Sequence, residues 1–426
     1  MLNFIEELQW RGMLHDMTPG VEEILNSRKV LGYIGFDPTA PSMTIGNYVQ
    51  IMLLKIFQMS GHTPIVLMGG ATGRIGDPSG KDKERELKSY DELDSNLEFQ
   101  KRQLKKFLDF EGSNAAIIVN NLDFYKEMNV LDFLRDAGKT LTVNYMMSKD
   151  SVKNRLDSGL SFTEFSYQLL QSYDFQILFS TYGCVLQMGG SDQWGNITSG
   201  TEFIRKNTDG KAYAVTTPLL TKADGTKFGK SEQGNLWLDP TLTSAYKFYQ
   251  FWLNCDDRDL PKFFRYFTLR TQTEVESLEV QHSENPRVLK ALLAEELTRR
   301  VHSDEDFDSV MAVSNILFGK DSDAARLHKM SKPELCTISE EIPSISLKID
   351  PFSILITDVL VQAGILPSKS EARKAIQNNA ISVNKVKITS HEQIISYADL
   401  LHEEFIMIEN GKKNKFMLRV ISSPNE

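Results

Sequence analysis

Cysteine is scarce in this chain, and long apolar runs are absent from it. The three cysteines among 426 residues, Cys184, Cys255 and Cys336, are widely spaced, so neither a disulfide framework nor a zinc cluster is expected. No segment approaches the roughly 18 unbroken apolar residues that a membrane span requires. The first residues lack the basic start and short apolar run of a signal peptide. We therefore expect a cytoplasmic protein with no membrane segment and no metal site of its own.

The charge of the chain is unevenly distributed. The net charge is −9, which argues against a surface covered by phosphate-binding residues. Between Lys369 and Lys387, however, five basic residues accompany a single acidic one, a local balance of 5 − 1 = +4. A basic segment on an otherwise acidic protein is typical of a local RNA-binding site.

Short apolar runs alternate with helical patterns through the first half of the chain. A helix is predicted from about Ile45 to Gly61, because its apolar residues recur on one face. Strand–helix alternation predicts an α/β fold, a Rossmann-like doubly wound parallel sheet with ligand sites at the carboxyl ends of its strands. The predicted strands are Val30–Phe36, Pro64–Met68, Ala115–Val119, Cys184–Met188 and Ala214–Leu220.

The pattern changes after about Thr243. It is mainly helical as far as Phe318, poorly periodic from Gly319 to Asp350, and compact again from Pro351. The length allows about three domains of roughly 150 residues each. We predict a catalytic domain over residues 1–220, a helical domain over 221–320, a linker with limited structure over 321–350 and a small α+β domain over 351–426.

One loop, from Gly35 to Asn47, joins a predicted strand to a predicted helix. Such a junction offers free backbone N–H groups and the positive end of a helix dipole to a phosphate. Gly46 allows a nucleotide to lie close to the backbone. Taken alone, an ordinary capped turn explains this loop more simply.

A second loop contains Lys227-Phe228-Gly229-Lys230-Ser231. Its two lysines, three residues apart and beside glycines, can neutralise a departing pyrophosphate, which stabilises a transition state electrostatically. By itself a string of this kind is usually a solvated loop. The two loops together are a far stronger signal than either one alone.

These loops resemble the HIGH and KMSKS signatures of the class I aminoacyl-tRNA synthetases, and in particular the bacterial-type tyrosyl enzymes. The resemblance covers essentially the whole chain. It implies that ATP, accompanied by Mg²⁺, activates L-tyrosine, which is then joined to the 3′ end of tRNA(Tyr) without a covalent enzyme intermediate. It also implies a homodimer, for which the apolar-rich stretch Val130–Met147 is the candidate interface. The matching stretches are Gly35–Thr39, Gly69–Gly73, Ile75–Gly80, Phe162–Tyr167, Gly189–Asn196 and Ala223–Lys230.

The candidate tyrosine pocket begins with a helical spacing. Tyr167, Gln171 and Asp174 are separated by four and three residues, so they project from one helix face. A solvent-facing polar stripe is the alternative. The resemblance implies that Asp174 and Tyr33 hold the substrate phenol. It further implies contacts to the α-ammonium group from Tyr167, Gln171 and Asp77, and to the carboxylate from Gln193.

The resemblance also implies where ATP is held. Asp192 accepts a hydrogen bond from a ribose hydroxyl, and Gly190 allows close backbone approach. The loop Gly69–Gly80 lacks the spacing of a P-loop, and by resemblance it lies over the active site. The implied ATP contacts are Gly35, Asp37, Gly46, Gly190, Asp192 and Lys230. The implied catalytic residues are Thr39, Thr44, Asn47, Lys81, Arg85, Lys227, Lys230 and Ser231, although Lys81 and Arg85 could equally be an exposed charge pair.

The first signature departs from the family pattern at one position. Thr44-Ile45-Gly46-Asn47 stands where the family reads HIGH, and Asn47 keeps a donor at the second histidine position. The Thr44 hydroxyl is shorter than the first histidine and carries no charge. We expect the contact to the γ-phosphate to be weaker by about 1–2 kcal/mol, the scale of a hydrogen bond to a charged group.

The last part of the chain resembles an S4-type RNA-binding domain, most clearly over Leu366–Ile376. Ser368 has the features of a helix N-cap, with Glu371 three residues later as its capping-box partner. A solvated basic helix is the alternative to RNA binding. The residues expected to follow RNA phosphates from one helix face are Lys369, Arg373 and Lys374.

Two other functions compete with a tyrosyl enzyme. The tryptophanyl enzymes share the fold and both signatures, but the Tyr33 and Asp174 pair and the S4-like segment argue against them. A catalytically weakened or non-catalytic RNA-binding paralogue is favoured by Thr44 alone. The two signature lysines and Asp192 argue the other way, since a pure RNA binder has no use for them.

Overall fold

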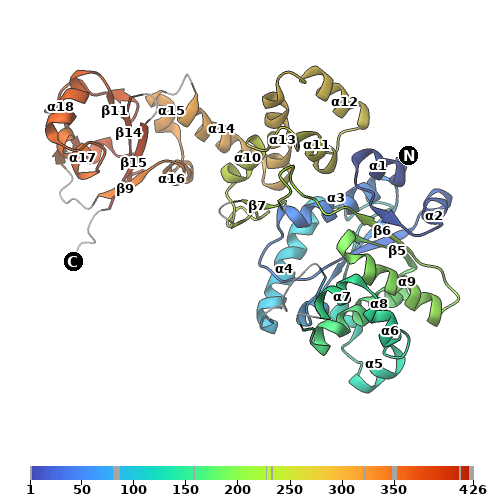
Figure 1. Cartoon of the computed structure of the whole chain (residues 1–426). Helices are drawn as coiled ribbons and strands as arrows, with labels where there is room; N and C mark the ends of the chain where they lie inside the picture. The colour runs from blue at the N-terminus through green and yellow to red at the C-terminus, as the bar shows by residue number, and fades with distance from the viewer. Residues whose placement is uncertain are drawn as a thin grey trace. The chain divides into compact units, whose positions relative to one another are not determined.

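The structure is a computed structural model, and it describes residues 2–79, 87–156, 159–226, 228–231, 234–319, 323–347, 353–411 and 414–421. The chain divides into two compact units (Figure 1). The first consists of Met1–Thr243 and Phe251–Leu297, and the second of Ser244–Gln250 and Thr298–Glu426.

A six-stranded sheet forms the centre of the first unit, with the order β1-β6-β5-β2-β3-β4. Only β1 is antiparallel to its neighbour, so the predicted parallel sheet is confirmed. The strand order reverses between β2 and β5, where a doubly wound sheet opens a crevice for ligands. The strands are β1 (Asp16–Met17), β2 (Leu31–Phe36), β3 (Thr63–Met68), β4 (Ile117–Asn120), β5 (Cys184–Gly190) and β6 (Tyr213–Thr217).

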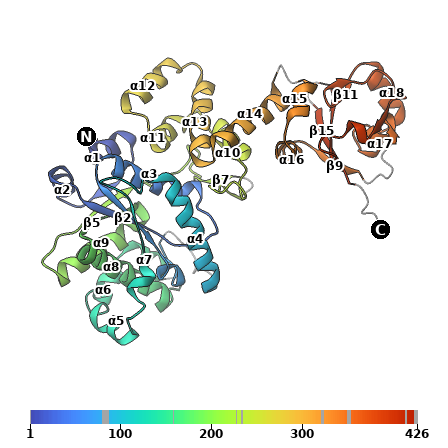
Figure 2. The same ribbon diagram turned by 180° about the vertical axis from the view of Figure 1, so that it is seen from behind.

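Helices cover both faces of this sheet (Figure 1, Figure 2). On one face α3 (Ile45–Met59) packs on β2 and β3, with α4 (Tyr90–Phe107) beside it. A Cβ atom on Gly32 would lie only 2.8 Å from the ring of Phe57, so this glycine lets α3 approach the sheet. On the other face α8 (Phe162–Tyr182) and α9 (Trp194–Asn207) pack on each other and on β5. The predicted helix after Ile45 is therefore confirmed.

Shorter elements complete the first unit. The helices are α1 (Phe4–Arg11), α2 (Val21–Ser27), α5 (Val130–Asp136), α6 (Val143–Met147), α7 (Asp150–Leu156), α11 (Leu260–Phe267) and α12 (Gln272–Gln281). The 3-10 turns are η1 (Thr72–Arg74), η2 (Asn121–Phe124) and η3 (Ser191–Gln193), and β7 (Lys230–Ser231) pairs with β8 (Gly234–Asn235). Among the described residues, none of the helices is long and apolar enough to cross a membrane.

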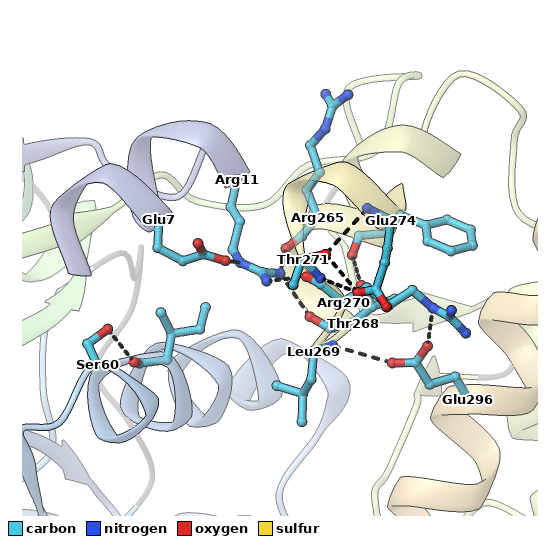
Figure 3. A network of polar contacts seen from close by, with 12 residues as sticks. Glu7, Arg11, Ser60, Arg265, Thr268, Leu269, Arg270, Thr271, Glu274 and Glu296 are labelled. Carbon is cyan, nitrogen blue, oxygen red and sulfur yellow. Dashed lines mark hydrogen bonds and ion pairs between the residues drawn. The ribbon is translucent and has the colours of Figure 1, made fainter. Parts of the chain in front are cut away.

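Arg11 fastens the first helix to the end of α11 (Figure 3). Its Nη1 donates to the carbonyl oxygens of Arg265 at 2.6 Å and Thr268 at 2.8 Å, and its Nη2 donates to that of Arg270 at 2.9 Å. Its Nε donates to Glu7 at 2.7 Å. A helix leaves its last carbonyl groups without partners, and a cation at that end is favourable. The buried guanidinium thus completes the end of α11.

The second unit contains a five-stranded sheet with the order β12-β11-β14-β15-β9, in which only β9 runs parallel to its neighbour. Its strands are β9 (Ser344–Leu347), β11 (Ile381–Val383), β12 (Val386–Lys387), β14 (Phe405–Asn410) and β15 (Asn414–Val420), and β10 (Ser353–Leu355) pairs with β13 (Ile394–Ser396). Its helices are α14 (Asp304–Phe318), α15 (Ala324–Lys329), α16 (Lys332–Glu341), α17 (Ile356–Gln362) and α18 (Lys369–Gln377), with the turn η4 (Tyr397–Asp399). The helices α10 (Ala245–Leu253) and α13 (Pro286–Val301) have residues in both units.

The stretch from Gly319 to Asp350 was expected to have limited structure, and its described residues differ from that expectation. They form α15, α16 and β9. A capping box of Ser331 and Glu334 begins α16, and β9 pairs with β15, about 70 residues further along the chain. The short helices and the distant strand partner explain why no periodicity is visible locally.

Candidate active site

A chain of hydrogen bonds joins polar residues at the carboxyl edge of the sheet. The Tyr167 hydroxyl on α8 donates to Asp37 at 2.8 Å, and Thr72 donates to the other Asp37 oxygen at 2.7 Å. Asn121 donates to Thr72 at 3.0 Å and to Asp174 at 2.8 Å. Asp37, Thr72 and Asn121 follow β2, β3 and β4 respectively, so the parallel sheet itself brings them together.

Asp174 is buried, with 1% of its surface exposed, and accepts two hydrogen bonds. The Tyr125 hydroxyl donates to Oδ1 at 2.6 Å, and Asn121 donates to Oδ2 at 2.8 Å. Burial raises the pKa of Asp174 to about 7; the two hydrogen bonds lower it, and the charge of Asp37 raises it. The carboxyl group is therefore poised to titrate near neutral pH.

Tyr33 lies on β2 with its ring edge against Phe175, at a centroid distance of 5.2 Å. Its buried hydroxyl has no hydrogen-bond partner within the described part of the chain. Burial raises the pKa of Tyr33 well above its usual value, and the charges of Asp174 and Cys184 add to the rise. The hydroxyl therefore stays protonated, and a buried donor without a partner is costly unless a ligand supplies one.

A second polar group surrounds Asp77. Gln193 donates to its Oδ2 at 2.6 Å, Asn196 lies 3.5 Å from its Oδ1, and Asn196 also donates to Ser79 at 3.1 Å. The Gln171 amide nitrogen lies 3.5 Å from the Gln193 oxygen. The buried Oε1 of Gln171 has no partner among the residues that the structure describes, so an acceptor is available here.

The two signature loops lie against each other. The Ile45 amide donates to the carbonyl of Leu236 at 2.9 Å, and the Leu236 amide donates to that of Gly229 at 3.1 Å. Gly229 has a φ of 88°, and a Cβ atom there would lie 3.0 Å from Ile45 and 3.3 Å from the amide of Gly46. Only glycine combines this conformation with so close an approach.

The Thr44 hydroxyl donates to the side-chain oxygen of Asn47 at 2.9 Å, and so does the Thr44 backbone amide. Both bonds fix the orientation of the exposed Asn47 amide, whose nitrogen then faces away from Thr44. The sequence led us to expect a Thr44 hydroxyl directed at a phosphate. In the structure it donates to Asn47, and the phosphate contact stays a prediction.

Phe228 anchors the second signature loop. Its side chain is buried, with 4% of its surface exposed. Four aromatic rings surround it at centroid distances from 5.1 to 6.1 Å, those of Phe251, Trp252, Phe263 and Phe267. The loop therefore rests partly on α11, which carries two of these rings.

The other predicted ATP residues are described only in part. Asp37, Thr39 and Asp192 are half-buried, and Gly35 and Gly46 are exposed. A Cβ atom on Gly190 would lie 2.6 Å from the Asp192 carboxylate. Lys81, Arg85 and Lys227 lie outside the described residues, and of Lys230 and Ser231 only the backbone is described.

The predicted RNA-binding helix is α18, and its N-cap is confirmed because Ser368 accepts from the Glu371 amide at 3.3 Å. Lys369, Arg373 and Lys374 are exposed. Lys369 pairs with Asp358, and Lys374 pairs with Glu371 at 3.0 Å.

Lys385 belongs to the same basic segment of the sequence but is not at the surface. Its side chain is 4% exposed; it pairs with Glu409 at 2.7 Å and donates to the carbonyl of Ile316 at 3.0 Å. It therefore contributes nothing to a basic surface.

Sequence reasoning did not identify the donors to Asp174. Asn121 lies two residues after the predicted strand Ala115–Val119, which places it at the ligand edge of the sheet, so this signal was available. Tyr125 carries no comparable local signal. Asn196 and Ser79, which contact each other beside Asp77, were also missed as individual contacts.

Comparison with known proteins bears on this site. The family model described as tRNA synthetases class I (W and Y) matches residues 25–319. The parallel sheet and the paired signature loops thus define a class I aminoacyl-tRNA synthetase core, a class whose members use ATP as a substrate. A second model, the tyrosine–tRNA ligase SYY-like C-terminal domain, matches residues 334–418.

Individual relatives show which family within this class the chain resembles. A tyrosine–tRNA ligase of Cytophaga hutchinsonii is 54% identical over 98% of this chain and 100% of its own length, and one of Bacteroides fragilis is 50% identical over 98% and 99%. The structure of a C-terminally truncated mitochondrial tyrosyl-tRNA synthetase of Aspergillus nidulans is 31% identical, with a TM-score of 0.66, over 75% of this chain and 95% of that one. The chain belongs to the tyrosine–tRNA ligase family.

Proposed function

We propose that the chain activates L-tyrosine with ATP to form tyrosyl-adenylate and transfers the tyrosyl group to the 3′ end of tRNA(Tyr). The buried pair of Tyr33 and Asp174 is the observation that carries this proposal. A substrate phenol donates to the Asp174 carboxylate and accepts from the Tyr33 hydroxyl, so both groups gain partners. An indole N–H only donates. A tryptophan substrate would leave the Tyr33 hydroxyl without an acceptor.

The backbone end of the substrate is assigned to the polar group around Asp77. Tyr167, Gln171 and Asp77 receive the α-ammonium group, for which the free oxygen of Gln171 and the carboxylate of Asp77 are suitable acceptors. Gln193 borders the substrate carboxylate. The hydrogen bond from Tyr167 to Asp37 supports a fixed position for the Tyr167 ring.

The nucleotide is assigned to the two signature loops and the start of α9. Thr39, Gly46 and Asn47 hold phosphates, with Thr44 positioning Asn47, while Gly35 and Asp37 border the nucleotide. Gly190 and Asp192 hold the ribose. The charge on the leaving pyrophosphate is neutralised by Lys81, Arg85, Lys227 and Lys230, and the Ser231 hydroxyl can donate a hydrogen bond to it. These roles are assigned from the positions of the residues in the sequence alone.

Catalysis in this proposal depends on positioning and charge. An oxygen of the tyrosine carboxylate attacks the α-phosphorus of ATP, and pyrophosphate leaves. A ribose hydroxyl of the tRNA then attacks the tyrosyl carbonyl, and AMP leaves. Aligned reactants and fixed donors supply the rate enhancement. We assign Mg²⁺ to the phosphates of ATP, because this ion is usually bound through one or two carboxylates and substrate phosphates rather than by an all-protein cage.

Transfer RNA is assigned to α18, where Lys369, Arg373 and Lys374 are exposed. Their charges suit contacts with phosphates. The reaction belongs in the cytoplasm, where its tRNA and ATP are found. We also propose a homodimer that forms through the segment Val130–Met147.

Tyrosine-dependent exchange of pyrophosphate into ATP is expected for the purified chain, with tryptophan giving no exchange above background. The first step alone produces this signal, so tRNA is not needed. Exchange with tryptophan in place of tyrosine would contradict the assignment of Tyr33 and Asp174. Absence of exchange with both amino acids would favour a non-catalytic RNA-binding paralogue.

Aspartate at positions 131 and 134 is expected to convert the dimer into monomers. Leu131 is 72% exposed and Leu134 is 49% exposed, so neither is needed inside the subunit. Sedimentation equilibrium should show half the wild-type mass for Leu131→Asp/Leu134→Asp. Val280→Asp, at an apolar residue that is 78% exposed on α12, is the control and should sediment like wild type. A dimeric double variant would place the interface elsewhere.

A further inference from the structure

The hydroxyl of Tyr125 lies beside the candidate specificity carboxylate. It is 2.6 Å from Oδ1 of Asp174 and 3.2 Å from the carbonyl oxygen of Leu170. Tyr125 directly follows η2, and its ring packs near Phe133 and Tyr173 at centroid distances of 6.2 and 6.1 Å. Tyr125 is not among the side chains that contact tyrosine or ATP in the proposed reaction.

A phenol has one proton to donate, and geometry decides which acceptor receives it. The Asp174 contact is shorter by 0.6 Å and involves a carboxylate, and hydrogen bonds to charged acceptors are the stronger ones. With Asn121 on Oδ2 and Tyr125 on Oδ1, each oxygen of Asp174 has one protein donor. Each oxygen also keeps acceptor capacity, so the carboxylate can still receive the proton of a substrate phenol.

We propose that Tyr125 is a positioning residue for tyrosine recognition, because it fixes the Asp174 side chain and keeps it in the acceptor state that a substrate phenol requires. The inference rests on the proposed assignment of Asp174 to that phenol. Tyr125 acts through Asp174 and does not itself contact the substrate.

The electrostatics around Asp174 support this role. Burial raises the pKa of Asp174 to about 7, and the bonds from Tyr125 and Asn121 work against that rise. The charge of Asp37 acts on Asp174, and the charge of Asp174 in turn acts on Tyr33, Tyr167 and Tyr173. Cys184 also acts on Tyr33, and Asp77 acts on Tyr167.

Loss of the Tyr125 bond removes a contribution that lowers the pKa of Asp174, so the pKa rises further. At neutral pH a larger fraction of the carboxyl is then protonated. A protonated Asp174 presents a donor where the substrate phenol needs an acceptor, and the phenol proton loses its partner. Tyrosine binding in a variant that lacks the hydroxyl should therefore weaken most at low pH.

The test is Tyr125→Phe in the full-length chain, assayed by tyrosine-dependent pyrophosphate exchange from pH 6 to 9. We expect the KM for tyrosine to rise about tenfold while kcat changes by less than about twofold, because the lost contact serves the ground state and transition state alike. The acidic limb of the kcat/KM profile should move to higher pH. Preference for tyrosine over phenylalanine should fall about tenfold, since phenylalanine does not use Asp174.

Tyr173→Phe is the matched control, since it removes a neighbouring hydroxyl that makes no hydrogen bond to Asp174 within the described part of the chain, and it should behave like wild type. Wild-type kinetics and pH profile for Tyr125→Phe, or equal losses in both variants, would overturn the inference. Asp174→Asn distinguishes a failure of the role of Tyr125 from a failure of the proposed tyrosine site. If it loses tyrosine activity while Tyr125→Phe does not, only the role of Tyr125 fails; if it too behaves like wild type, the proposed tyrosine site fails.

Discussion

Asp174→Asn is expected to lower tyrosine-dependent pyrophosphate exchange by about 10²-fold. Asparagine has nearly the same shape, but it replaces one carboxylate oxygen by an NH₂ donor. One of the two donors now directed at this side chain, Tyr125 or Asn121, would then face another donor. The substrate phenol loses a charged acceptor worth about 1.5–3 kcal/mol. The stranded donor destabilises the free enzyme and the complex alike, so the upper end of this loss, about 10²-fold, is expected for the rate.

Phenylalanine provides the internal comparison for this variant. It has no phenol, so its slow activation should change little, and the preference for tyrosine should collapse. Asp209→Asn, at an exposed aspartate after α9, is the matched charge change and should leave both rates unaltered. Unchanged tyrosine kinetics in Asp174→Asn would show that the phenol binds elsewhere.

Arg155→Met is expected to reduce the free energy of unfolding by about 3–5 kcal/mol, the cost of leaving one partner of a buried ion pair uncompensated. The side chains of Arg155 and Glu164 are each 2% exposed, and the two Arg155–Glu164 bonds are 3.1 and 2.9 Å long. Arg155 also donates to the carbonyl of Gly159 at 3.2 Å. Glu164 lies in the first turn of α8, the helix that carries Asp174.

Denaturant unfolding followed by circular dichroism measures this loss. Arg155→Met/Glu164→Leu should recover most of it, because removing both charges leaves no buried ion behind. Arg205→Met is the control: Arg205 is 68% exposed and pairs with Glu202, and exposed pairs are worth about 0–1 kcal/mol. Equal losses of unfolding free energy for the Arg155 and Arg205 variants would show that breaking the buried ion pair costs no more than breaking the exposed one.

Local sequence patterns were sufficient for the framework of the catalytic unit. The five predicted strands, the helix beginning at Ile45 and the common face of Tyr167, Gln171 and Asp174 all follow from spacing over a few residues. Asn121 could have been found in the same way, because it directly follows a strand at the ligand edge. Patterns of this kind are short-range, so they can be recognised in the sequence without knowledge of the tertiary structure.

Residues whose surroundings come from distant parts of the chain could not be predicted. Tyr125 reaches Asp174 across 49 positions, and Lys385 is buried by a partner 24 positions away and by the end of α14. A count of charges therefore overstated the basic surface. The contact of the Thr44 hydroxyl with Asn47 was not foreseen either, because a resemblance to the histidine of the family directed attention to the phosphate.

The buried guanidinium of Arg11 makes residues 4–11 part of the support for the second signature loop. They close the end of α11, and the rings of that helix support Phe228 in the second signature loop. Removing helix α1 would leave the end of α11 without these hydrogen bonds and would weaken the support of Phe228 in the second signature loop.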